Sequence, residues 1–126
     1  MTTSLWVTLR YADADTALDW LRAVGFTERV VDRDEQDPTV VQHAELEWPG
    51  GGGLMLGTHR DSPAWPVEPG HGATYAVTDD VDGTYEAALG AGGRAVAPPA
   101  DQPYGGRGAS VADPEGNLWN FGSYRP

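Results

Sequence analysis

The chain has 126 residues and a formal net charge of −11, from 19 acidic residues against 8 basic ones. This is the size of one domain with its own core, and so acidic a surface repels phosphate backbones, which excludes nucleic acid as a partner. There is no cysteine, no run of roughly 20 apolar residues that could cross a membrane and no signal-peptide pattern, so we expect a cytoplasmic protein without a membrane partner.

The first half of the chain begins with the segment Leu5 to Tyr11, which is typical of a β-strand. Asp13 can cap the helix that follows, whose apolar residues recur at helical spacing as far as Val24, and Gly25 can end it. Three short strands are then predicted at TERVVDR, VVQHAELEW and GLMLGTH, and the turn PGGGG separates the last two.

The second half repeats this order. A strand is predicted at Gly72 to Val77, and Asp80 can cap a helix that continues to Leu89 and ends near Gly92. Three strands follow at RAVAPP, GASVADP and LWNFGSY, with the turn PEGN before the last one. Each half therefore reads as a βαβββ module.

The two modules span about residues 4–59 and 72–124, and the connector 60–71 is rich in proline and glycine. We expect a single α+β domain, 1–126, in which the modules form a cupped mixed sheet with the helices on its outer face. The helix of each module covers one face of its strands and leaves the other bare, so the inside of the cup is the expected ligand pocket.

Three runs carry a family resemblance: YADADTALDWLRAVGF, VTDDVDGTYEAALGAGG and PYGGRGASVADPEGNLWNF. They resemble the vicinal oxygen chelate superfamily, which includes glyoxalase I, extradiol dioxygenases and the bleomycin resistance proteins. The resemblance covers nearly the whole chain and implies the paired-module fold. It also implies a homodimer, whose modules pair either within a chain or by exchange between chains. Because this fold hosts many chemistries, it leaves the function open.

The resemblance further implies metal-ligand positions at Trp6, near Met55, at Gly72 and at Asn120. The first three offer no oxygen or imidazole ligand, and Asn120 offers only a neutral amide oxygen. His71 would need a one-residue slip, which turns a strand side chain to the other face of its sheet. We therefore expect no metal site of the family type and no cofactor.

Polar candidates for ligand contact lie in two places. His43 and Glu45 alternate along one strand and share a face, which can line the cup or can point to solvent. In the cup, His43 could act as a base. Arg107 lies in the glycine-rich stretch PYGGRG, from which it could hold a carboxylate or phosphate or simply stabilise the turn.

Aromatic residues supply the other candidates. Neighbouring residues of a strand face opposite ways, so Asn120 can point into the cup only if Trp119 packs under the helices. Trp6 then points inward, where Trp65 and Tyr104 could join it in an aromatic lining that suits a flat or cationic ligand. Alternatively, these rings fill the cavity.

The function that we expect is metal-independent binding of a small molecule, in which the protein sequesters an aromatic or cationic compound and so confers antibiotic resistance. The alternative is a lyase, isomerase or dioxygenase-like enzyme that acts on a small metabolite in the same cup; for it the sequence assigns no catalytic residue. The expected ligand-binding residues are Trp6, His43, Glu45, Trp65, Tyr104, Arg107 and Asn120.

Overall fold

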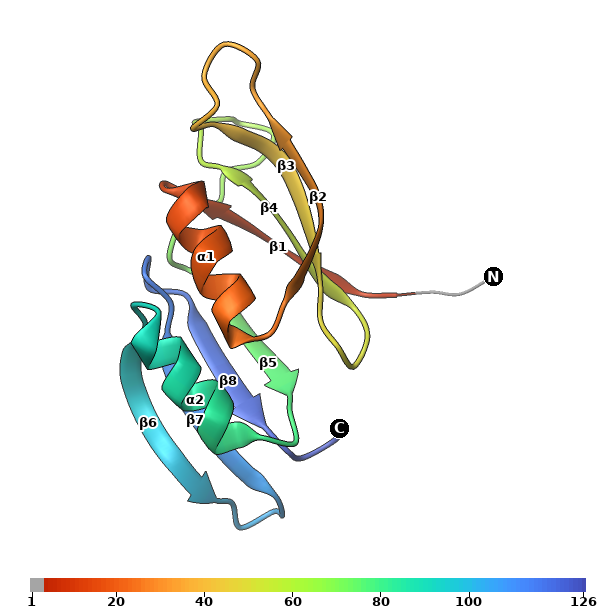
Figure 1. The fold of residues 1–126 in the computed structure, drawn as a ribbon, viewed down its shortest axis with the longest axis vertical. Coiled ribbons are helices and arrows are strands. Elements are labelled where there is room, and N and C mark those ends of the chain that lie inside the picture. Colours follow the sequence, from red (N-terminus) through yellow and green to blue (C-terminus); the bar gives the residue numbers. More distant parts are fainter. Residues whose placement is uncertain (1–3) are drawn as a thin grey trace.

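The computed structural model describes residues 4–126 and contains two four-stranded mixed sheets, one in each half of the chain (Figure 1). The N-sheet has the strand order β1-β4-β3-β2, and the C-sheet has the order β5-β8-β7-β6. The first module contains β1 (Trp6–Tyr11), α1 (Ala14–Val24), β2 (Thr27–Arg33), β3 (Val41–Glu47) and β4 (Gly53–Thr58). The second contains β5 (Ala73–Val77), α2 (Val81–Gly90), β6 (Arg94–Asp101), β7 (Arg107–Ala112) and β8 (Leu118–Gly122). The predicted α+β fold of two βαβββ modules is confirmed.

The helix ends follow the predicted capping residues. The Asp13 carboxylate accepts the backbone N–H of Thr16 at the start of α1, and Asp80 does the same for Gly83 in α2. Gly25 ends α1 with a φ of 126°, which favours glycine. Strand β6 contains Pro98 and Pro99, as predicted, and continues two residues further through Ala100 and Asp101. It tolerates the prolines because it is the edge strand of the C-sheet.

Both helices lie on the same side of the molecule, where they cover one face of each sheet (Figure 1). They also contact each other, so one core continues through both modules. Trp20 of α1 packs against Trp119 of β8 with ring centroids 5.7 Å apart, and its indole N–H donates to the Ala88 carbonyl of α2. Trp119 is thus under the helices, as expected. Neither helix of the described chain is long and apolar enough to span a membrane.

The turn between β7 and β8 joins the two modules. Asp113 is 3% exposed, and its carboxylate accepts hydrogen bonds from Tyr11 of β1, from the Asn117 amide and from the Trp119 indole. Burial and the adjacent Asp113 raise the pKa of Tyr11 well above its ordinary value, so its hydroxyl remains a donor. Glu115 accepts two backbone N–H groups of the first module, at Ala12 and Asp13. We call this group (Tyr11, Asp113, Glu115 and Asn117) the inter-module latch.

Candidate ligand site

The face of the N-sheet that no helix covers, here the N-face, carries polar and aromatic side chains. Leu9 and Tyr11 of β1 and Ala44 and Leu46 of β3 are buried toward α1, so the residues between them point the other way. The residues of this bare face are Trp6, Thr8 and Arg10 of β1, His43 and Glu45 of β3, and Met55 of β4. His43 and Glu45 thus lie on the bare face and not among the core residues.

Two aromatic rings lie at the N-face. The Trp6 ring rests directly over Gly53 of β4, where a Cβ would come within 2.6 Å of it. The guanidinium carbon of Arg10 lies 5.9 Å from the ring centroid of Trp65, which is a cation–π contact. Because Arg10 is on the N-face, this contact brings the connector to that face. The sequence analysis did not single out Arg10, although its place between Leu9 and Tyr11 gives it the same face as Trp6.

His43 and Glu45 form a dyad on the N-face. The Nε2 atom of His43 lies 2.9 Å from a carboxylate oxygen of Glu45, and both side chains are partly buried. Imidazole and carboxylate are both side chains that can exchange a proton with a bound molecule, and the carboxylate is also an acidic contact for a cation.

The uncovered face of the C-sheet, here the C-face, holds Asn120. Asn120 is exposed between Tyr75 of β5 and Ser110 of β7, whereas its neighbours Trp119 and Phe121 are buried. The Tyr75 hydroxyl donates to the Tyr124 carbonyl, 2.6 Å away. Tyr75 was not among the predicted site residues, although the alternation along β5 places it on this face.

Tyr104 and Arg107 lie at the end of the C-sheet. The Tyr104 ring meets that of Tyr124 edge to face at 5.3 Å and remains largely exposed. Arg107 donates to Asp82 of α2 at 3.0 Å and to Asp101 of β6 at 3.2 Å, and these bonds raise the pKa of its guanidinium. Arg107 thus ties β7 to α2 and β6.

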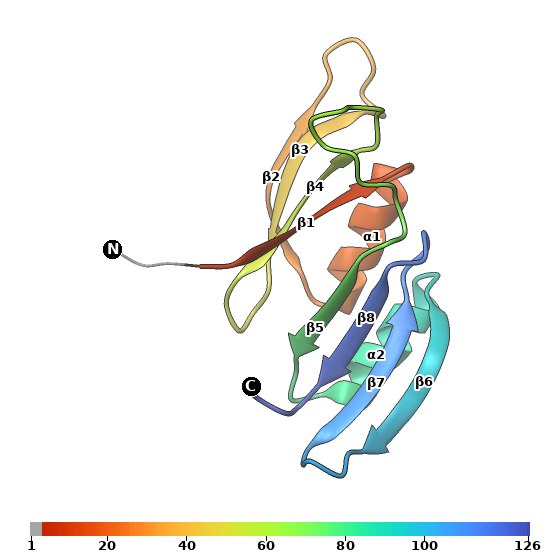
Figure 2. The ribbon, with the colours of Figure 1, turned by 180° about the vertical axis from the view of Figure 1, so that it is seen from behind.

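The predicted residues form two groups. The N-face holds Trp6, His43 and Glu45, and Trp65 reaches it through Arg10, whereas Tyr104 and Asn120 belong to the C-sheet. Both bare faces are turned away from the helices and lie side by side when the molecule is seen from behind (Figure 2). Within one chain they are not placed opposite each other.

A groove of about 790 Å³ lies between the modules, where the edge strands β1 and β5 approach each other. Its lining includes Val7, Phe26, Trp48, Tyr75 and Val77. The Trp48 indole donates to the Val77 carbonyl across it and closes its inner side against the core. The groove is the second place in the described chain where a small apolar ligand could fit.

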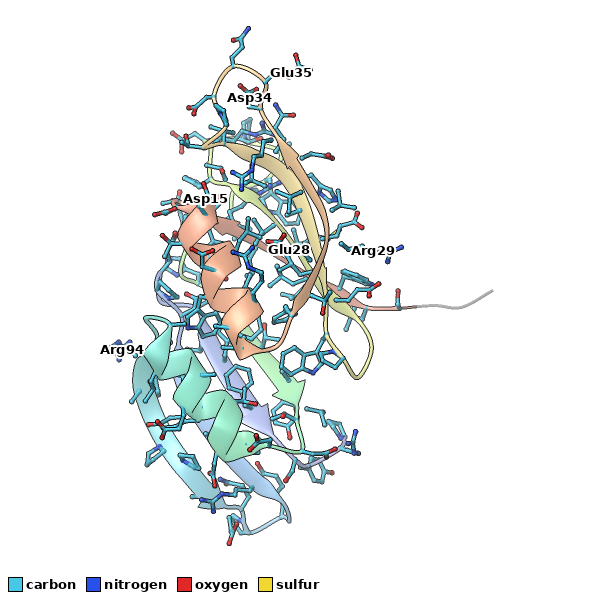
Figure 3. The ribbon with its side chains drawn as sticks, in the orientation of Figure 1. Asp15, Glu28, Arg29, Asp34, Glu35 and Arg94 are labelled. Atoms are coloured by element: carbon cyan, nitrogen blue, oxygen red, sulfur yellow. The ribbon has the colours of Figure 1, made fainter. Side chains whose placement is uncertain are left out.

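Acidic side chains dominate the surface of the first module. Asp15, Glu28, Asp34 and Glu35 lie around it, with Arg29 at its edge and Arg94 on the other module (Figure 3). Several of these carboxylates already have partners, such as Asp15 with Arg33 at 2.7 Å. Together with the net charge of −11, they favour the approach of cations.

The four family metal-ligand positions do not form a donor set. The Trp6 indole N–H donates to Ser4, and Met55 offers only a thioether. A Cβ at Gly72 would lie 2.6 Å from Leu9 and 3.0 Å from the Asn117 amide oxygen, which is the core side, whereas Asn120 lies on the C-face. A side chain at position 72 would therefore point toward the core, whereas Asn120 points to the C-face, so the two could not bind one ion. These residues do not fit the metal of the family's enzymes.

The family model described as Glyoxalase/Bleomycin resistance protein/Dioxygenase superfamily matches residues 3–121. Among curated proteins, CFP32 from Mycobacterium tuberculosis (strain CDC 1551 / Oshkosh) is 33% identical over 120 residues, which is 94% of this chain and 42% of that protein. CFP32 from Mycobacterium bovis matches equally. The chain thus spans about two fifths of the length of the curated relatives it matches.

Among solved structures, TioX from Micromonospora sp. ML1 superposes with a TM-score of 0.77 at 31% identity, covering 98% of this chain and all of TioX. A family member from Sphaerobacter thermophilus has a TM-score of 0.70 at 25% identity over 97% of both chains. The antibiotic binding protein TnmS3 from Streptomyces sp. CB03234 has a TM-score of 0.68 at 23% identity, with 97% of this chain and 95% of TnmS3 covered. The last likeness concerns the fold alone.

Proposed function

The chain belongs to the glyoxalase/bleomycin resistance protein/dioxygenase superfamily, and from this premise we propose that it binds and sequesters a small aromatic cation without a metal. A toxic natural product, such as an antibiotic, is the class of ligand that this activity would neutralise. The N-face carries the proposal, because it combines the Trp6 and Trp65 indoles with the Glu45 carboxylate.

The physical basis is stacking combined with charge. An indole ring attracts a flat cation through dispersion and through its quadrupole. Arg10 already contacts one side of the Trp65 ring in this way, so a ligand cation would use the rest of that ring together with Trp6. Glu45 and the acidic surface add a field that favours positive ligands. TnmS3, an antibiotic binding protein, has the same fold, which supports the idea that a protein with this fold can bind an antibiotic.

The His43–Glu45 dyad favours one alternative, an enzyme. An imidazole 2.9 Å from a carboxylate could remove a proton from a bound metabolite, as a lyase or isomerase requires. One measurement separates the two functions, because an enzyme releases a chemically changed molecule whereas a sequestering protein releases its ligand unchanged.

We also propose that the protein is a homodimer in which each N-face lies over the C-face of the other copy. The two faces of one chain lie side by side (Figure 2), so a second copy is the simplest way to enclose a ligand between them. Asn120 and Tyr75 of one copy would then complete the site around Trp6 of the other. We expect light scattering coupled to gel filtration to give twice the 13.4 kDa mass of the chain. A monomer at micromolar concentration would contradict this.

The binding proposal is tested by calorimetry with proflavine, a flat aromatic cation, in buffer with a chelator. We expect saturable binding, several-fold weaker in Glu45→Gln, and no binding of an acridine carboxylate of similar shape. Glu35→Gln is the matched control, because it removes the same charge from an exposed loop. If Glu45→Gln and Glu35→Gln lose the same affinity for proflavine, the effect comes from net charge and not from a contact with Glu45. Chromatography should recover the proflavine unchanged.

A further inference from the structure

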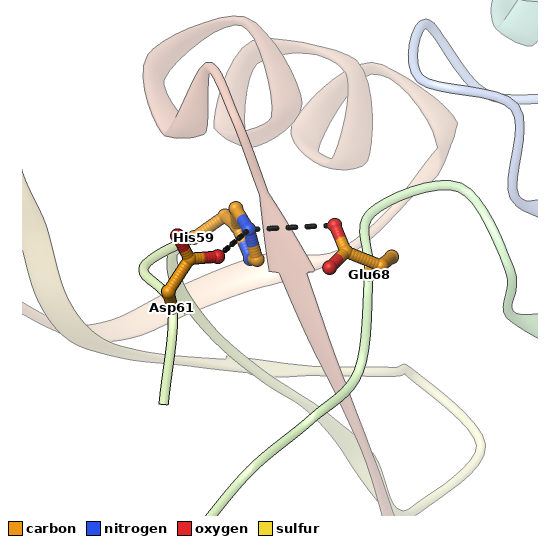
Figure 4. Close-up of side chains that lie close together, drawn as sticks. All are labelled: His59, Asp61 and Glu68. Atoms are coloured by element: carbon orange, nitrogen blue, oxygen red, sulfur yellow. Dashed lines mark ion pairs between the residues drawn. The ribbon is translucent and has the colours of Figure 1, made fainter. Parts of the chain in front are cut away.

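We propose that the connector holds a zinc ion between His59, Asp61 and Glu68. The three side chains converge, and their ligand atoms all lie within 4.8 Å of one another (Figure 4). The Nε2 atom of His59 is 3.6 Å from Asp61 and 3.5 Å from Glu68. None of the three occupies a metal position that the family resemblance implies, so this site is separate from the one excluded above.

The spacing is that of loose ion pairs, and it also matches the distance between two ligands of one ion. An N–H···O hydrogen bond is about 2.7–3.2 Å long, so both distances from His59 exceed it. Zinc binds imidazole nitrogen and carboxylate oxygen at about 2.0–2.2 Å, which in a tetrahedral site separates neighbouring ligand atoms by roughly 3.3–3.5 Å. Two carboxylates also balance the charge of a divalent ion. One imidazole with two oxygens favours zinc over magnesium, which prefers oxygen alone.

The backbone positions the three ligands in advance. His59 directly follows β4, and its backbone N–H donates to the Tyr11 carbonyl at 2.8 Å, so the imidazole is fixed at the end of the N-sheet. Its side chain is 24% exposed, whereas the side chains of Asp61 and Glu68 are 100% and 67% exposed and meet it from the loop. The chain then passes through Asp61 and returns at Glu68, with Pro63 and Pro66 between them to restrict the loop. These residues line a hollow of about 330 Å³, which leaves room for the ion and a bound water.

The ion would cross-link the two ends of the connector, because His59 and Asp61 lie at its beginning and Glu68 near its end. Trp65, which contacts Arg10 of the N-face, lies between them. Zinc would therefore restrict the motion of the loop that carries Trp65. This inference is independent of the proposed function, because zinc alone is the probe.

The test is a zinc titration of the chelator-treated protein, followed by calorimetry. We expect one zinc per chain in the micromolar range, no competition from excess magnesium, and affinity lower by about tenfold or more in His59→Gln and in Glu68→Gln. His71→Gln is the matched control, since it removes an exposed imidazole next to the same loop. Zinc binding should also change the tryptophan fluorescence, because Trp65 lies between the ligands, and Trp65→Phe should keep the binding heat but lose this fluorescence change. Circular dichroism checks that each variant folds.

Three results would overturn the inference. The first is no stoichiometric zinc binding by the native chain. The second is unchanged affinity in both His59→Gln and Glu68→Gln. The third is a loss in His71→Gln, or in His43→Gln, equal to that in the cluster variants, which would place the ion elsewhere.

Discussion

Replacing Asp113 with alanine should lower the free energy of unfolding by about 3–5 kcal/mol. The carboxylate is almost fully buried, and it accepts from Tyr11 at 2.6 Å, from the Asn117 amide at 2.9 Å and from the Trp119 indole at 3.2 Å. Without it, these donors remain buried and unpaired, and the contact between the two modules weakens. Urea unfolding followed by tryptophan fluorescence measures the loss.

Two variants show whether the loss belongs to the inter-module latch. Tyr11→Phe removes one donor and leaves the carboxylate paired, so it should cost only about 1–2 kcal/mol. Glu35→Ala removes an exposed carboxylate from a loop and should change stability by less than about 0.5 kcal/mol. If Asp113→Ala unfolds at the same urea concentration as Glu35→Ala, the latch does not hold the modules together.

Trp6→Ala should weaken proflavine binding by about 2 kcal/mol or more, which is roughly 30-fold. The indole lies on the N-face over Gly53 and offers a flat aromatic ring for stacking there. The side chain is not part of the buried core, so the variant should still fold. Calorimetry under the conditions used for the native chain gives the change in affinity.

Leu5→Ala is the control for this loss, because it shortens the neighbouring exposed side chain of the same segment. Leu5 lines the groove between the modules, whereas Trp6 does not. A ligand held at the N-face loses affinity only in Trp6→Ala. If Trp6→Ala binds proflavine as tightly as the native chain and Leu5→Ala binds it more weakly, the ligand lies in the groove and not on the N-face.

The fold could be predicted because its signals are local. Asp13 and Asp80 cap the helices, and the alternation along β3 separates Ala44 and Leu46 from His43 and Glu45. The last two residues of β6, Ala100 and Asp101, were not predicted, because they belong to the strand only through their pairing with Gly108 and Arg107 of β7.

The site could be predicted only in part, because tertiary contacts decide which candidates meet. The alternation of side chains along each strand predicted that Trp6 and Asn120 point away from the helices, and the structure places both on bare sheet faces. The contact of Arg10 with Trp65 depends on how the connector returns over the N-sheet, which no local pattern specifies. The contact between His59 and Glu68 likewise depends on the path of the connector. The hydrogen bond between Tyr11 and Asp113 joins residues far apart in the sequence, so no local pattern predicts it either.

The most direct test of the central claim is a crystal structure of the protein soaked with proflavine in the presence of a chelator. The account predicts electron density for the flat ring against Trp6 and Trp65 on the N-face, near Glu45 and with no metal between them. Density confined to the groove beside Trp48 and Tyr75, or a metal ion coordinated at Asn120, would contradict it.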